Sequence, residues 1–154
     1  MQNQDPALTA DELRSLRCVA GMMIPASTAH GVPGADDDTI FADIVDNLGR
    51  DAASVKQGLQ HLDALAGGRF ADRDPAQRQA AAAALQDAGG TPLMALISVI
   101  AQCYYRDRRV MRSLGIEVRP PFPKGYEVAQ GDWSLLDPCG HALRSIATRP
   151  DCVN

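Results

Sequence analysis

Proline and glycine punctuate this chain and fix where its helices start and stop. Asp74-Pro75 and Thr91-Pro92 each place a capping residue before a proline at the first helical position, where the missing amide costs nothing. The pairs Gly67-Gly68 and Gly89-Gly90 stop a helix, because glycine takes the left-handed conformation that ends one. These signals predict an alanine-rich helix between Pro75 and Gly89 and a further helix after Pro92.

Two helices are predicted nearer the N-terminus. A capping box, Thr9-Ala10-Asp11-Glu12, opens the first helix, and Pro25 ends it. The apolar residues on one face of this helix are Leu13, Leu16, Ala20, Met23 and Ile24. After a loop from 25 to 37, the run Asp36-Asp37-Asp38 opens the second helix. Its apolar stripe is Ile40, Phe41, Ile44, Val45 and Leu48.

The acidic run Asp36-Asp37-Asp38 has two interpretations. Carboxylates at a helix start are stabilised by the exposed amides and the helix dipole. A cation site is the sharper alternative, but the run lacks the alternating ligand spacing of a calcium loop. We therefore interpret the run as a helix start.

A third helix is expected from about Asp51 to Ala66, and a short sixth one from Arg108 to Leu114, which Asp107 caps and Gly115 closes. The apolar face of the third is Val55, Leu59, Leu62 and Leu65.

The stretch from Leu93 to about Tyr105 is apolar nearly all round, which is typical of a central, buried helix. No convincing run of residues alternates as a strand would. The chain of 154 residues is therefore expected to form one domain with an all-α fold, a single bundle of five or six helices whose body runs from about 9 to 115.

After Gly115 the sequence changes character. Prolines and glycines between 116 and 140 prevent a long helix and predict an extended, partly polyproline-like arm, followed by a short C-terminal tail. The arm is nevertheless apolar, and apolar side chains on an extended segment need something to cover them. Its large apolar residues are Ile116, Phe122, Tyr126, Trp133, Leu135 and Leu136.

Two coverings for the arm are equally compatible with the sequence. The arm could fold back over its own helical body, or it could dock on another protein, since aromatic side chains are common anchors in interfaces. Tyr104 and Tyr105, at the end of the central helix, either help to seat the arm or pack in the core, and core packing is favoured.

Charge and hydropathy exclude several classes of function. The formal net charge of −4 argues against a nucleic-acid-binding surface. The most apolar run, Leu93 to Ala101, is about half of the ~20 residues that a membrane-spanning helix needs. The start of the sequence lacks the basic and apolar regions of a signal peptide, so no export address is expected from it.

The sequence shows no concentrated set of reactive groups. His30, His61 and His141 stand far apart, and no metalloprotease, hydrolase or P-loop motif is present. The glycines of Gly31-Val32-Pro33-Gly34 follow a helix and have the wrong spacing for dinucleotide binding. No catalytic, cofactor-binding or metal-ligating residue is predicted, which favours a binding or structural role.

The four cysteines do not form a C-x-x-C motif. Cys18 and Cys103 fall on apolar helical faces, where buried thiols are common. Cys139 and Cys152 lie in the tail, and whether they pair stays open.

Two stretches carry a resemblance to a known family. The first comprises Ile24-Pro25-Ala26, Pro33-Gly34-Ala35 and the helix from Ile40 to Leu48. The second runs from Tyr104-Tyr105-Arg106-Asp107-Arg108-Arg109-Val110 through Leu114-Gly115 to Pro120-Pro121-Phe122-Pro123-Lys124-Gly125-Tyr126. Together they resemble the gluconate 2-dehydrogenase subunit 3 family over roughly residues 9 to 138. These are the small, or gamma, subunits of FAD-dependent sugar and alcohol dehydrogenases of the glucose-methanol-choline type.

The resemblance implies a helical subunit without a cofactor of its own. Such a subunit pairs with a large subunit that carries FAD, assists its folding or export, and in some complexes works beside a cytochrome subunit. Many members carry a twin-arginine signal, and no twin arginine precedes the first helix here. Two locations stay open: the periplasm, if the chain is exported with its partner or a signal was removed, and the cytoplasm, if the lack of a signal is genuine.

The hypothesis that follows places the arm across the large flavoprotein subunit. The residues expected at this partner interface are Pro120, Pro121, Phe122, Pro123, Tyr126, Trp133, Leu135 and Leu136. The prolines would hold the arm extended at low entropic cost. Two rivals remain: a small helical ligand-binding domain or enzyme with a cryptic pocket that holds His30 or His61 beside a carboxylate, and a homodimer that exchanges the arm.

Overall fold

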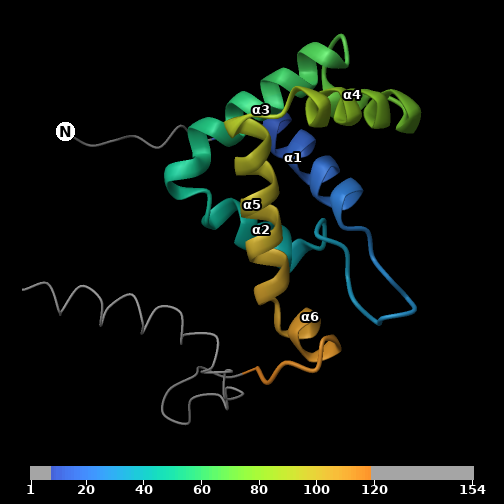
Figure 1. Cartoon of the computed structure of the whole chain (residues 1–154), viewed down its shortest axis with the longest axis vertical. Helices are drawn as coiled ribbons and strands as arrows, with labels where there is room; N and C mark the ends of the chain where they lie inside the picture. Colours follow the sequence, from blue (N-terminus) through green and yellow to red (C-terminus); the bar gives the residue numbers. More distant parts are fainter. Residues whose placement is uncertain (1–7, 119–154) are drawn as a thin grey trace, which may run out of the picture. The chain divides into compact units, whose positions relative to one another are not determined.

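The computed structural model describes residues 8–118, which form an all-α bundle (Figure 1). This confirms the predicted fold class. The α-helices and the 3-10 turns, labelled η, are α1 (Ala10–Met23), α2 (Asp38–Asp46), η1 (Gly49–Asp51), α3 (Ala52–Leu65), η2 (Phe70–Asp72), α4 (Pro75–Ala88), α5 (Thr91–Arg106) and α6 (Arg108–Ser113). The only extended pairing in this part of the chain is an isolated antiparallel bridge between Ser27 and Val32, in the loop that joins α1 to α2.

The capping signals act largely as predicted. In the box that opens α1, the Glu12 amide donates to Thr9 Oγ1 over 3.2 Å and the Thr9 amide donates to Glu12 Oε2 over 2.8 Å. Asp74 accepts from the Gln77 amide over 2.8 Å at the start of α4. The expectation for Thr91 is wrong: Thr91 is the first residue of α5, and Gly90, with φ 91°, is its N-cap. Pro92 therefore occupies the second helical position.

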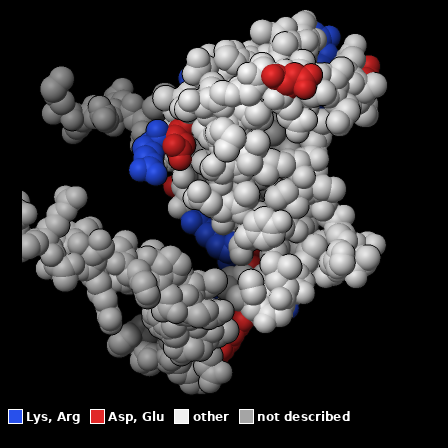
Figure 2. Space-filling view, in the orientation of Figure 1, with Lys and Arg blue, Asp and Glu red and all other residues white. Residues whose placement is uncertain are grey.

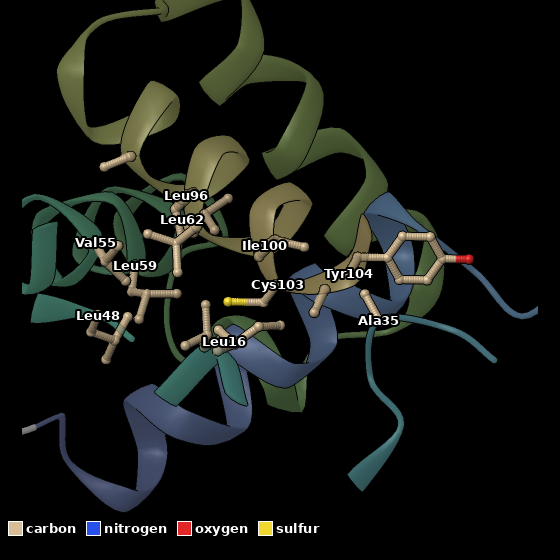
Figure 3. Packing of buried hydrophobic residues seen from close by; sticks show 14 of the residues in the cluster. Leu16, Ala35, Leu48, Val55, Leu59, Leu62, Leu96, Ile100, Cys103 and Tyr104 are labelled. Carbon is tan, nitrogen blue, oxygen red and sulfur yellow. The ribbon is translucent and has the colours of Figure 1, made fainter. Parts of the chain in front are cut away.

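Helix α5 lies at the centre of the bundle and packs on α3, α2 and α6 (Figure 1). Its inner face meets α3, and Leu59, Leu62, Leu96 and Ile100 gather there in the core (Figure 3). Helix α3 also packs on α1 and α4. The fully buried large side chains are Phe70, Leu16, Ile40, Ile44, Leu59, Leu62, Leu96, Ile100, Val55 and Val110.

The burial of α5 is less complete than its sequence suggests. Met94 is 57% exposed and Tyr105 is 56% exposed, so one side of the helix faces outward. Tyr104, by contrast, is 5% exposed and packs at the edge of the core, with its hydroxyl pointing outward (Figure 3). The two neighbouring tyrosines thus have different environments, and core packing is confirmed for Tyr104 alone.

Two glycines form a sharp corner between α4 and α5. Gly89 and Gly90 both have positive φ, 64° and 91°, and the two helices are bent by 115° across them. None of the helices between residues 8 and 118 is long and apolar enough to span a membrane alone; α4 and α5 meet that length and composition together, but only as this bent pair.

Candidate partner-docking site

The eight residues predicted at the partner interface all lie outside the described residues. They are Pro120, Pro121, Phe122, Pro123, Tyr126, Trp133, Leu135 and Leu136. Cys139, Cys152 and His141 lie outside as well. The structure does describe the segment from which the arm departs, namely the corner between α5 and α6 and the chain as far as Val118.

Arg109 ties the start of α6 to the start of α2. Its guanidinium donates to Asp37 over 2.7 and 3.2 Å and to Asp107 over two contacts of 3.1 Å. Asp37 is the N-cap of α2 and accepts from the Thr39 amide over 3.1 Å, which confirms that it is a helix start. Asp107 is the N-cap of α6 and accepts from the Arg109 amide over 2.8 Å. One side chain therefore joins two helix N-caps.

The electrostatics of this arrangement follow from its geometry. The hydrogen bonds from Arg109 lower the pKa of the Asp37 and Asp107 carboxyls below their usual range. The same contacts raise the pKa of Arg109. All three groups are therefore charged near neutral pH, and bidentate pairing makes each contact more directional than a single ion pair.

Arg106, at the end of α5, forms a second arginine–carboxylate pairing about one turn before Arg109. We call the two pairings, that of Arg109 with Asp37 and Asp107 and that of Arg106 with Asp43, the clamps. The Nε and Nη2 of Arg106 donate to the two carboxylate oxygens of Asp43, on α2, over 2.6 Å each. The bonds lower the pKa of Asp43. Below them, the Cys103 thiol lies 3.6 Å from the Asp43 carbonyl, and burial raises the pKa of that thiol. Cys103 is therefore an inert, protonated core residue rather than a nucleophile.

A groove of about 560 Å³, lined largely by charged residues, lies beside these clamps, between α2 and the end of α5. It is lined by Thr39, Ile40, Ala42, Asp43, Asp46, Cys103, Arg106, Asp107, Arg108 and Arg109. Asp46 and Arg108 are exposed and form no ion pair with any residue from 8 to 118. The groove thus offers one carboxylate and one guanidinium for contacts with another molecule.

The chain leaves α6 through a defined turn. The Ile116 amide donates to the Met111 carbonyl over 2.9 Å and the Gly115 amide donates to the Arg112 carbonyl over 3.0 Å, with φ 72° at Gly115. This is a Schellman motif, for which glycine is the preferred residue. Leu114 and Ile116 on either side of it are 55% and 45% exposed. Apolar surface therefore begins where the arm begins.

The two stretches that carry the family resemblance meet at this corner. Asp43 belongs to the first stretch, and Asp37 is the N-cap just before the helix of that stretch; Arg106 and Arg109 belong to the second. The Ala35 amide also donates to the Ile24 carbonyl over 2.9 Å and closes the loop that leads into α2. Residues about 70 positions apart thus form one structural unit.

The two described histidines lie apart from the groove beside the clamps. His30 and His61 are both exposed, and neither lines that groove or the one between α1, α4 and α5. Among residues 8–118 there is no group of three or more His, Cys, Asp or Glu side chains that could hold a metal ion. Cys18 is half-buried, and Cys18 and Cys103 form no disulfide.

Comparison of the chain with protein-family models, with curated proteins and with solved structures finds no match.

Proposed function

We propose that this chain is a small subunit without catalytic activity of its own. It binds a large FAD-dependent sugar or alcohol dehydrogenase subunit and assists its assembly and stability. FAD resides in the large subunit, and a cytochrome subunit can complete the complex. The proposal starts from the resemblance to the gluconate 2-dehydrogenase subunit 3 family.

The observation that carries the proposal is the corner at α6. Arg106 with Asp43 joins the two stretches behind the resemblance there, and Arg109 binds Asp37, the N-cap just before the helix of the first stretch. These contacts fix α6, whose single buried residue is Val110, at the point where the Pro- and aromatic-rich arm departs. A docking segment that starts from a fixed helix loses less conformational freedom on binding, which favours binding.

The core of the helical body is compatible with a binding role. Residues 8–118 enclose a continuous apolar core and form a folded body. Binding to a folded partner stabilises both proteins by mass action, which is the physical basis of an assembly role. The isolated chain is accordingly expected to be poorly soluble or marginally stable.

The test is recovery of the tagged full chain from its native cells, followed by an absorption spectrum and a mass spectrum of the eluate. We expect a larger protein in roughly equal amount with a flavin spectrum. The variant Trp133→Ala should recover less of it, because a central aromatic anchor is lost. A chain recovered alone, colourless and monodisperse would contradict the proposal.

A further inference from the structure

A second groove, of about 330 Å³, opens between α1, α4 and α5, away from the clamps at α6. Its floor is buried core, and its walls are half-buried or exposed side chains. Val19, Met22 and Met23 come from α1, Gln79, Ala82 and Gln86 from α4, and Leu93 and Ile97 from α5.

The groove exists because α4 stands away from α1 and α5. The main contacts of α4 are with α3 and η2, and the glycine corner turns α5 by 115° from the direction of α4. Phe70 and Leu62 fill the angle from below. No residue from 8 to 118 fills the space above them.

None of the residues that line this groove is charged. Two stretches far apart in the sequence, 18–35 and 88–105, contain no Asp, Glu, Lys or Arg, and both contribute walls. In Figure 2 charged side chains are visible at the level of α4, and the right-hand part of the view below that level, down past α1, shows almost none. The bare surface is notable in a chain of which 22% is charged.

The uncharged surface continues beyond the groove. On α4 it runs from Gln79 through Ala83 to Gln86, which lie on one face and are exposed, and it ends at the exposed Asp87. The one arginine of this helix, Arg78, turns aside and lies 3.5 Å from Cys18 Sγ. Charge depletion together with methionine is typical of the centre of a protein interface, and methionine adapts readily to a partner's shape.

We propose that this groove is a docking surface on the helical body for uncharged, apolar side chains of the large subunit. The inference rests on the proposed function and adds a contact separate from the arm. A charged side chain would lose its hydration there and gain no partner. Gln79 and Gln86 are two helical turns apart, about 10 Å along the axis, and their amides are placed to meet backbone groups of the inserted segment.

The test compares flavoprotein recovery by tagged full-length variants from native cells. Gln79→Lys places a charge at the groove, and Ala82→Glu places one in its wall. Gln77→Lys is the matched control, because Gln77 is exposed on the same helix but outside the groove. We expect flavin per tagged chain to fall about tenfold or more for the two groove variants, as buried unpaired charges require, and to be unchanged for Gln77→Lys.

The outcomes separate the two proposals. If the wild-type chain recovers a flavoprotein and Gln79→Lys recovers equal amounts, the groove inference is overturned while the proposed function stands. If the wild-type chain recovers none, both fail. If the groove variants instead abolish self-association of the purified chain and leave flavoprotein recovery intact, the occupant is a second copy and the inference is again overturned. Circular dichroism melting curves show whether each variant is folded. If Ala82→Glu unfolds at a lower temperature than the wild type, flavoprotein recovery by Gln79→Lys, at an exposed position, decides the test.

Discussion

Arg109 is the residue on which the geometry of the α6 corner depends most directly. Its side chain binds the N-caps of two helices, α2 and α6. Asp37, the cap of α2, lies 72 residues before Arg109 in the sequence. The sequence predicts both caps, since a cap depends on its neighbours within three residues. It does not predict that one arginine joins them, because no local pattern records which distant side chain lies opposite.

Replacing Arg109 by lysine tests this role. A lysine is a point charge and cannot donate bidentately to two carboxylates. We expect the free energy of unfolding to fall by about 0.5–1 kcal/mol, as for other partly exposed ion pairs, and amide exchange in α6 to accelerate. Arg112→Lys is the control, since Arg112 is exposed on the same helix and has no ion pair among residues 8–118. Equal stability of the two variants would refute the role.

The carboxylates of the corner predict how stability depends on pH. Asp37, Asp43 and Asp107 have pKa values below the ordinary 3.8, because arginine hydrogen bonds favour their charged forms. Their contribution is therefore fully present above pH 4 to 5 and is lost as the pH falls through the lowered pKa values. Urea midpoints measured from pH 6 down to about 2.5 should decline, and the decline should be shallower in an Asp43→Asn, Arg106→Gln variant.

At the level of helices and turns, local signals account for most of the fold. The starts of α1, α2, α4 and α6 were all predictable from caps, because capping is a property of adjacent residues. The turn η2 was missed, although Phe70 in it is completely buried. Phe70 has no periodic neighbours, and its amide is held by Asp63 Oδ1 at 2.8 Å, a contact between elements.

The approach of α3 to α5 depends on a glycine that no sequence pattern singles out. A Cβ on Gly58 would lie 2.7 Å from Leu96 Cδ1 and 3.2 Å from the Pro92 carbonyl oxygen. The buried side chain of Leu96 would have to shift, and the carbonyl is part of the backbone and is not free to turn away.

Gly58→Ala should therefore destabilise the protein despite the better helix propensity of alanine. Overpacking costs about 1–3 kcal/mol, whereas the propensity gain is about 1 kcal/mol. The control is Gly21→Ala in α1, where the three atoms nearest the new Cβ, at 3.0 to 3.2 Å, all belong to the exposed side chain of Asp36, whose carboxylate is able to turn away. Chemical denaturation should show loss for Gly58→Ala and little change or a gain for Gly21→Ala.

For the whole molecule, the sequence revealed the composition of the surfaces but not how they are combined. The apolar arm after Gly115 was evident from its residues. The charge-free groove was not, because stretches 18–35 and 88–105 border one groove, between α1, α4 and α5, only in the folded bundle. Convergence of this kind needs the fold, since periodicity describes one helix at a time.

The uncharged character of the groove and the apolar arm predicts how the proposed complex responds to salt. At about 1 M NaCl the Debye length is roughly 3 Å, so surface ion pairs are screened. We expect the chain and its flavoprotein partner to stay together on gel filtration at this salt concentration. Dissociation by salt would show that charged contacts, such as those available at Asp46 and Arg108 in the groove beside α2, hold the complex instead.

The loop between α1 and α2 offers a position for reporter groups. Ser27 and Val32 close it by two mutual backbone hydrogen bonds of 3.0 Å, and Thr28, Ala29, His30 and Gly31 at its tip are exposed. The Ser27–Val32 hydrogen bonds would hold the base of the loop around a short epitope or a fluorophore inserted at this tip. The tip residues line neither groove. Fluorescence assembly assays could then use this loop and leave both chain ends untouched.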